Sequence, residues 1–305
     1  ESVKKKGELH MKKGIGKTIS LIIVLTLIFQ MLIPIIPELN LEVLAADETS
    51  ENTEEISRNY EIKKEETWDI SANGDGSIIA KWTRENRTLT ISGTGKMKDW
   101  DINVKEDWHN TQYTKAIENV IINDGVTNIG KYAFYGCDSL KSINIPEGVT
   151  SIGGSAFWGC SSLKSINIPK EVTSIEWQAF RGCSGLESIN IPEGVTSIGN
   201  YAFYECSSLE SINIPEGVTH IEYDAFFKCS KLENINVSSD NKSYISVNGI
   251  LFNKEKTKLI KYPAKKNDVK GYIIPNTVIE IYSYAFEECS SLESINIPEG
   301  VTSIE

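Results

Sequence analysis

The chain has 305 residues, and its 31 basic and 42 acidic side chains give a formal net charge of −11. This balance argues against a nucleic-acid-binding protein, because neutralising a phosphate backbone takes an opposite net charge or a concentrated basic face. We interpret the acidic excess as a contribution to solubility.

Residues 1–46 have the features of a secretory signal peptide. A basic segment that begins at Met11 precedes an almost unbroken apolar run over 19–36, and Ala45-Ala46 supplies small residues for cleavage. We therefore expect translation to begin at Met11 and residues 1–10 to be an over-extended start. The alternative is an uncleaved membrane anchor, since the run is almost long enough to span a bilayer.

Two segments separate this N-terminal part from the repeats. Residues 47–66 are dense in Asp and Glu and are predicted to be a flexible acidic linker. Residues 67–116 are predicted to form an N-terminal β cap, in which 78–82 and 88–92 flank a polar turn and form a hairpin. An open solenoid end must be covered, so we expect the tryptophans of this segment in the cap core rather than in a ligand site.

A 23-residue repeat organises residues 117–305. The block that begins at Leu140 returns almost unchanged at three equal intervals. Each copy predicts a short buried strand, a proline that ends its hydrogen-bond ladder, a second extended piece and a single helical or 3₁₀ turn at Ala-Phe. Successive strands should pair in parallel about 4.8 Å apart, and each unit buries its apolar face only against its neighbours. The leucines Leu140, Leu163, Leu186 and Leu209 should therefore form one interior row.

The pattern L-x-x-I-x-I-P-x-x-V-x-x-I-x-x-x-A-F-x-x-C, read from residues 140–160, resembles the leucine-rich repeat in its BspA-like bacterial surface variety. The resemblance covers about 117–305 and implies a mainly β solenoid with short parallel strands. It also implies a secreted or cell-wall-displayed protein, often an adhesin that binds host matrix proteins or other cells. Two departures stand out: residues 232–268 run to 37 residues instead of 23, and the chain stops at Glu305 in mid-repeat, which predicts a truncated solenoid.

Six cysteines in a secreted chain would ordinarily suggest disulfides. Here one cysteine falls in each repeat, so a solenoid would arrange them in a column with their Cβ vectors side by side, which is a poor orientation for bonding. We predict small buried apolar residues, and no metal site, because a ladder does not converge its ligands on one point. The six are Cys137, Cys160, Cys183, Cys206, Cys229 and Cys289.

The long repeat contains an insertion at about 238–268, where Asn248-Gly249 between two apolar runs predicts a tight hairpin. Its lysines form a local basic cluster on an acidic protein. They are either solvated edge residues that oppose aggregation or a contact for an acidic partner such as a cell-wall polymer or a glycosaminoglycan. This candidate basic patch comprises Lys254, Lys256, Lys258, Lys261, Lys265 and Lys266.

The two predicted surfaces of the solenoid differ in variety. The strand face carries a uniform ladder of Ser and Asn, which suggests architecture, because recognising one partner requires different groups at different positions. Aromatic residues vary around the Ala-Phe turn, where they form a candidate ligand surface or, alternatively, stack between successive repeats. They are Tyr132, Tyr135, Trp158, Trp177, Tyr201, Tyr204, Tyr223, Phe227, Tyr282 and Tyr284.

No catalytic motif accompanies these surfaces. The three histidines share no motif, and the sequence lacks a zinc-type His-Glu-x-x-His, a phosphate-binding glycine loop and a Gly-x-Ser-x-Gly elbow. We expect no enzyme activity, no cofactor and no metal. The leading hypothesis is a secreted or cell-surface module that adheres to an extracellular protein or glycan, with no nucleic acid and with membrane contact only through the signal segment during export. The alternative is a targeting or spacer scaffold of a larger protein whose catalytic or wall-anchoring domain lies beyond Glu305.

Overall fold

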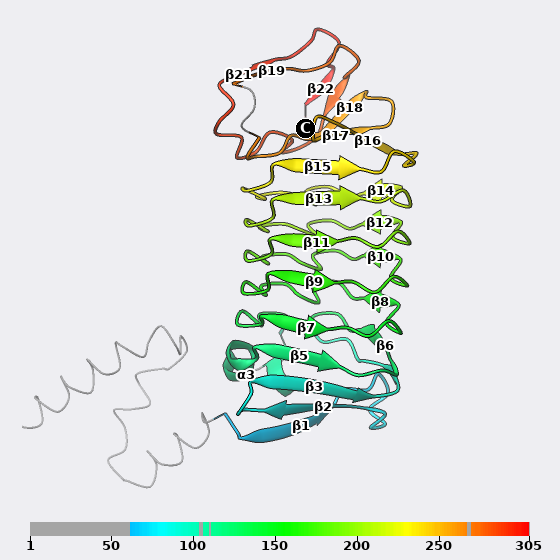
Figure 1. Ribbon diagram of the computed structural model, residues 1–305, viewed down its shortest axis with the longest axis vertical. Coiled ribbons are helices and arrows are strands. Elements are labelled where there is room, and N and C mark those ends of the chain that lie inside the picture. The colour runs from blue at the N-terminus through cyan, green and yellow to red at the C-terminus, as the bar shows by residue number, and fades with distance from the viewer. Residues whose placement is uncertain (1–61, 104–105, 110, 267–269, 305) are drawn as a thin grey trace, which may run out of the picture. The chain divides into compact units, whose positions relative to one another are not determined.

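The computed structural model describes residues 62–305 except for 104–105, 110, 267–269 and 305. The predicted signal peptide and residues 47–61 of the predicted linker lie outside this part. From Ile62 onward, short strands are stacked rung upon rung along one axis (Figure 1). No helix in the described part is long and apolar enough to cross a membrane.

An antiparallel sheet covers the N-terminal end of the stack (Figure 1). Strands β1 (Glu65–Asp69), β2 (Ile78–Thr83) and β3 (Thr88–Gly93) pair in this order, and β2 and β3 form the hairpin that the sequence predicts. Strand β3 then pairs in parallel with β5 (Asn119–Ile122), so the sheet continues into the solenoid and covers the edge of its first strand. Because β1 begins at Glu65, residues 65–66 belong to this sheet and not to the linker to which the sequence analysis assigned them.

The cap is closed by an aromatic core. The 3₁₀ turn η2 (Asp107–His109) and helix α3 (Thr111–Ala116) place Trp108 and Tyr113 against the sheet, where Trp82 and Trp108 are fully buried. The Trp108 ring stacks on Phe134 with a centroid distance of 6.2 Å, which joins the cap to the solenoid interior. These tryptophans are core residues, as the sequence predicts. The short strand β4 (Gly95–Lys96) pairs with β6 (Val126–Ile129) and starts the second column of strands.

Each rung of the solenoid contributes one strand to each of two columns. The first column continues from β5 through β7 (Ser142–Asn144), β9 (Ser165–Asn167), β11 (Ser188–Asn190), β13 (Ser211–Ile214) and β15 (Asn234–Val237). The second continues from β6 through β8 (Ser151–Ile152), β10 (Ser174–Ile175), β12 (Ser197–Ile198) and β14 (His220–Ile221). Pairs such as β9 with β11 are parallel and match residues 23 apart in sequence, for example Ile166 with Ile189. The mainly β leucine-rich-repeat solenoid predicted from the sequence is therefore confirmed.

The interior consists of rows of identical side chains. Leu140, Leu163, Leu186 and Leu209 are fully buried, as one interior row requires. The phenylalanines stack almost parallel, with 5.5 Å between the centroids of Phe157 and Phe180. All six cysteines are free, and each of four thiols donates a hydrogen bond to a phenylalanine carbonyl of the preceding rung, as Cys183 Sγ does to Phe157 O at 3.1 Å. Five cysteines thus fill a repeated buried corner, as predicted, whereas Cys289 is only half-buried.

The Ala-Phe segment is a run of hydrogen-bonded turns. Backbone N–H groups donate to carbonyls three residues earlier, as from Cys160 to Phe157, but a left-handed residue interrupts each run before a helix can form. One such residue precedes the alanine, for example Tyr201 with a φ of 57°. Another precedes the cysteine and is glycine in three rungs but Glu205, Lys228 or Glu288 in others.

The long repeat is one rung with a hairpin inserted in it. After β15, strands β16 (Tyr244–Val247) and β17 (Ile250–Asn253) form an antiparallel hairpin across Asn248-Gly249. Strand β18 (Lys258–Lys261) then enters the second column and pairs in parallel with β20 (Glu280–Ile281), which pairs with β22 (Ser303–Ile304). The first column resumes with β19 (Gly271–Ile273) and β21 (Ser294–Asn296).

This hairpin divides the interior into two apolar cores. Strand β17 lies between them, because Leu251 packs into the N-terminal core while Ile250 and Phe252 pack into the C-terminal one. The last rung leaves apolar side chains exposed: Ile297 is 48% exposed, whereas the equivalent Ile168 is 3% exposed. Stacking between neighbours therefore accounts for the burial of each rung.

Candidate binding surface

A continuous column of rings and one guanidinium runs along the Ala-Phe turns. Five of its members occupy the position directly after the buried phenylalanine of their rung, and the sixth, Tyr284, continues the column by contact with Phe227 at 4.4 Å. We call this set the ring column: Tyr135, Trp158, Arg181, Tyr204, Phe227 and Tyr284. The Arg181 guanidinium lies 4.4 Å from the Trp158 ring centroid and 4.6 Å from that of Tyr204. Ring contacts extend the column in both directions, from Trp158 to Tyr135 at 5.1 Å and from Tyr204 to Phe227 at 5.0 Å.

A second set of aromatic residues packs beside this column. Tyr132 contacts Tyr135 and also Trp177, two rungs away, with centroid distances of 6.0 and 5.7 Å. The Trp177 ring reaches that far because the intervening position is Gly154, where a Cβ atom would collide with the indole. Tyr201 packs on Tyr204 in the same manner at 5.5 Å. The rings are consequently held by one another along the side of the solenoid.

The aromatic residues both stack between rungs and reach solvent, so the structure contains elements of both alternatives that the sequence left open. Eight of the ten predicted residues are half-buried against neighbouring rungs, while Tyr223 and Tyr284 are 59% and 54% exposed. Stacking therefore occurs, and ring edges still reach solvent along the column. The most exposed rings gather at one place, where the rung before the inserted hairpin meets the rungs after it.

At this place the structure has a small pocket, which we call the seam pocket. It holds about 30 Å³ and is lined by Tyr223, Asp224, Phe227, Lys261, Tyr282 and Tyr284, among others. Lys261 is buried, and its Nζ donates a hydrogen bond to Tyr284 O at 2.9 Å. The Asp224 Oδ1 atom is also buried and accepts no hydrogen bond from the described residues. Two charged side chains with opposite hydrogen-bonding capacity thus line one pocket.

Burial disfavours both charges in the seam pocket. Desolvation raises the pKa of the Asp224 carboxyl above its ordinary value, although the Tyr201 hydroxyl and Lys261 oppose the shift. Desolvation also lowers the pKa of Lys261, against the influence of Cys229 and nearby acidic groups. The pocket is therefore a site where an added hydrogen-bond donor or acceptor would stabilise groups that the protein solvates poorly.

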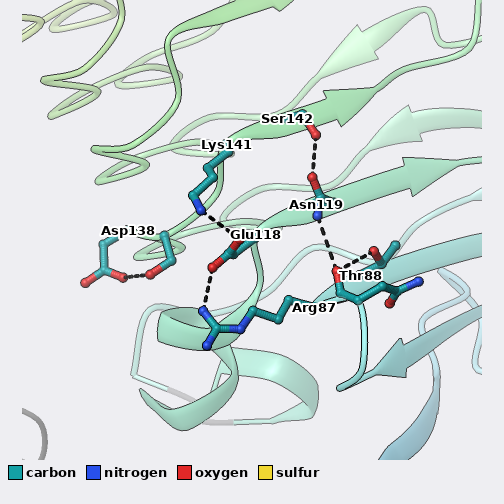
Figure 2. Close-up of polar contacts among 9 residues, drawn as sticks. Arg87, Thr88, Glu118, Asn119, Asp138, Lys141 and Ser142 are labelled. Atoms are coloured by element: carbon teal, nitrogen blue, oxygen red, sulfur yellow. Dashed lines mark hydrogen bonds and ion pairs between the residues drawn. The ribbon is translucent and has the colours of Figure 1, made fainter.

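A different charged cluster ties the cap to the first rung. Figure 2 shows Glu118 between Arg87 and Lys141, with ion-pair distances of 2.5 and 2.7 Å, and Ser142 Oγ donating to Asn119 Oδ1. Hydrogen bonds from Lys141 and Arg87 hold the pKa of Glu118 below its ordinary value. Because this half-buried carboxylate is paired on both sides, it is a structural link and not an acid–base group.

The comparisons with known proteins agree with this geometry. Residues 109–233, 150–272 and 264–305 match the BspA type leucine rich repeat region, in six copies. The chain belongs to the BspA type leucine-rich repeat family. A search of curated proteins gave no match.

Among solved structures, this BspA type chain is similar to a leucine-rich repeat protein from Eubacterium ventriosum, with 33% identity, a TM-score of 0.66, and coverage of 79% of this chain and 62% of that one. It is also similar in fold to the pneumococcal vaccine antigen PcpA, with 24% identity, a TM-score of 0.61, and coverage of 75% and 64%. The chain thus spans less than two thirds of either structure.

The basic patch expected on this BspA type chain is not a continuous exposed surface. Lys261 and Lys266 are 6% and 7% exposed, Lys258 pairs with Glu280 at 2.8 Å, and Lys254 donates to a backbone carbonyl. Only Lys256 and Lys265 of the six are exposed. The prediction is wrong for Lys261, because this residue occupies the position that a buried alanine has in the other rungs. The backbone hydrogen bonds show the equivalence: Tyr262 N–H donates to Ala285 O as Phe203 N–H donates to Ala225 O, so Tyr262 has the phenylalanine position and Lys261, directly before it, has the alanine position.

Two residues of the aromatic surface, Arg181 and Asp224, are not among the residues predicted from the sequence. Arg181 has the same repeat position as Trp158 and Tyr204, so aligning the copies would have revealed it as a member of the ring column. Asp224 occupies the position of Tyr201 and Tyr284, but nothing in its neighbours in sequence shows that its Oδ1 atom is buried without a hydrogen-bond donor. Within the described ranges, no group of three His, Cys, Asp or Glu side chains could hold a metal ion.

Proposed function

We propose that this chain is a binding module without catalytic activity, secreted or displayed on the cell surface, that adheres to an extracellular protein or glycan through the ring column. Membership of the BspA type family and the signal-like sequence at 1–46 support the location. The ring column supports the binding role, because it is the surface on which the side chains vary while the interior rows stay constant.

Physical properties of the ring column suit adhesion. Each ring of the column contacts at least one ring of another rung, so a ligand that packs on its exposed edge immobilises few additional rotamers. Arg181, between Trp158 and Tyr204, adds hydrogen-bond donors in a fixed plane. Repetition along the stack lets an extended ligand make many weak contacts at once.

A spacer scaffold is the second candidate, and the strand face favours it. There the polar side chains bond to each other from rung to rung, as Asn236 Nδ2 does to Asn213 Oδ1 at 2.9 Å. A surface that satisfies its own hydrogen bonds has less to offer a partner. On this reading the solenoid would only carry other domains.

The two candidates are separated by a binding experiment on the purified chain. Extracellular matrix proteins and cell-wall polysaccharides are immobilised and probed with the native chain, with a Trp158→Ser, Tyr204→Ser, Phe227→Ser variant, and with an Asn144→Ser, Asn167→Ser, Asn190→Ser control on the strand face. We expect the ring variant to lose binding by about tenfold or more and the control to retain it. Equal binding by both variants, or no binding by the native chain, would leave the scaffold reading.

A further inference from the structure

The seam pocket differs from the ring column because two charged side chains, Asp224 and Lys261, line it. It forms because the inserted hairpin brings Lys261 beside two rungs whose surface residues are Tyr223-Asp224 and Tyr282 to Tyr284. The rings flank it in two pairs, Tyr223 with Tyr282 at 6.0 Å and Phe227 with Tyr284 at 4.4 Å. A volume of about 30 Å³ accommodates one or two hydroxyl-sized groups.

The hydrogen-bonding capacity of the pocket defines what it can take. Asp224 Oδ1 is a buried acceptor without a donor among the described residues, and leaving such a group unpaired costs free energy. Lys261 is an ammonium with three N–H groups, one of which donates to Tyr284 O. A group that both donates to Asp224 and accepts from Lys261 therefore fits better than a group that does only one of these.

Charge restricts the ligand further. A cationic ligand would be repelled by the buried Lys261, and an anionic one by Asp224 and by Glu222, which also lines the pocket. A neutral hydroxyl avoids both penalties, since it donates and accepts. The exposed faces of Tyr223 and Tyr284 beside it offer apolar surface for the C–H groups of a saturated ring.

We propose that the seam pocket is a subsite for a neutral sugar of an extracellular glycan, whose hydroxyl groups donate to Asp224 and accept from Lys261 while its ring packs on Tyr223 and Tyr284. This inference rests on the proposed function, because it names the ligand class for one end of the same aromatic surface. On this proposal the glycan is held at the irregular rung that contains the hairpin and not at the regular repeats.

The test measures binding of neutral and charged oligosaccharides to the purified chain on a glycan array, followed by saturation-transfer NMR with the oligosaccharide that binds best. The informative variant is Asp224→Asn, which keeps the shape and tolerates the φ of 57° at this position but replaces one acceptor by a donor. Gln178→Asn is the matched control, since Gln178 has the same repeat position in a rung away from the seam and the same left-handed φ. Circular dichroism and thermal melting confirm that both variants fold as the native chain does.

We expect the native chain to bind neutral oligosaccharides, Asp224→Asn to bind them about tenfold more weakly, and Gln178→Asn to bind them unchanged. Tyr284→Ser should weaken binding in the same direction. Unchanged binding by Asp224→Asn, preference for charged sugars, or no neutral sugar bound would overturn the inference. In that case a protein ligand can still be tested. If Asp224→Asn binds this ligand normally while the Trp158→Ser, Tyr204→Ser, Phe227→Ser variant does not, the proposed function stands and the sugar subsite does not exist.

Discussion

Removing one ring from the phenylalanine row tests the stacking argument on which the fold rests. Phe180 is fully buried and stacks on Phe157 and Phe203 at centroid distances of 5.5 and 5.7 Å, with interplanar angles of 1° and 4°. Phe180→Ala should therefore destabilise the solenoid by about 3–5 kcal/mol, the range for a buried phenylalanine that leaves a cavity. Each ring pair accounts for about 0.5–1.5 kcal/mol of this beyond simple burial.

Phe226 supplies an internal comparison, because the regular row ends at this residue. It stacks on Phe203 at 5.8 Å, and the aromatic residue in the corresponding position of the next rung is Tyr262. Phe226→Ala should cost about 1 kcal/mol less than Phe180→Ala, since it forfeits one stacked pair where Phe180→Ala forfeits two. Phe180→Leu, which keeps most of the volume, should recover more than half of the loss.

Urea unfolding followed by circular dichroism and tryptophan fluorescence measures these differences. Four of the six tryptophans belong to the cap, so fluorescence reports mainly on the N-terminal end once Trp158 and Trp177 are replaced by Phe in all variants. A lag between the two signals in Phe180→Ala would then show that rungs on either side of the cavity unfold separately. The stacking account would be refuted if Phe180→Ala cost less than about 1.5 kcal/mol, or if Phe180→Leu and Phe180→Ala cost the same.

Three further outcomes follow from backbone geometry and burial. Gly182→Ala should destabilise the protein by about 1 kcal/mol, because Gly182 has a φ of 69° but room for a Cβ atom. Gly199→Ala should destabilise it more, because the added Cβ would lie 2.6 Å from Trp177 N. Urea midpoints in the reverse order would contradict this. Iodoacetamide should alkylate Cys289 first in the native chain, since burial raises its pKa to about 11 but that of fully buried Cys183 to about 12; mass spectrometry of a time course gives the order. Burial lowers the pKa of His109, so below about pH 6.5 the unfolded state binds a proton that the folded state refuses, and the free energy of unfolding should fall as pH drops. His109→Gln should flatten that part of the pH profile, and an unchanged profile would count against the assignment.

The structure could be predicted from the sequence wherever the 23-residue repeat is regular. The interior leucines, the free cysteines and the outward Ser-Asn ladder follow from one unit, because each rung has the same neighbours as the last. The positions of the aromatic residues follow from the same template. Their mutual contacts do not, since Trp177 reaches Tyr132 only because Gly154 lies between them.

The lysine cluster shows why the rest could not be predicted. Counting charges along 254–266 treats the insertion as a surface loop, and a hairpin indeed begins it. The segment that follows, however, is the second half of a rung, with Lys261 in the alanine position and Tyr262 in the phenylalanine position. Cys289 Sγ faces Tyr262 O at 3.7 Å, as other cysteines face a phenylalanine carbonyl. No charge pattern reveals which lysine enters the interior.

The same substitution explains why the seam pocket lies where it does. An alanine side chain fills its buried position completely, whereas a lysine at that position must extend past it until the ammonium reaches a hydrogen-bond acceptor, here the carbonyl of Tyr284. The rung before it then faces a polar neighbour, and Asp224 is tolerated where other rungs have Tyr, Ser or Gln. Regular rungs also contain buried polar atoms that have no partner among the described residues, namely Arg181 Nε and Asn200 Oδ1. Next to the rung that contains the hairpin, however, such an atom, Asp224 Oδ1, lines a pocket together with the buried Lys261, so a ligand could reach both groups there.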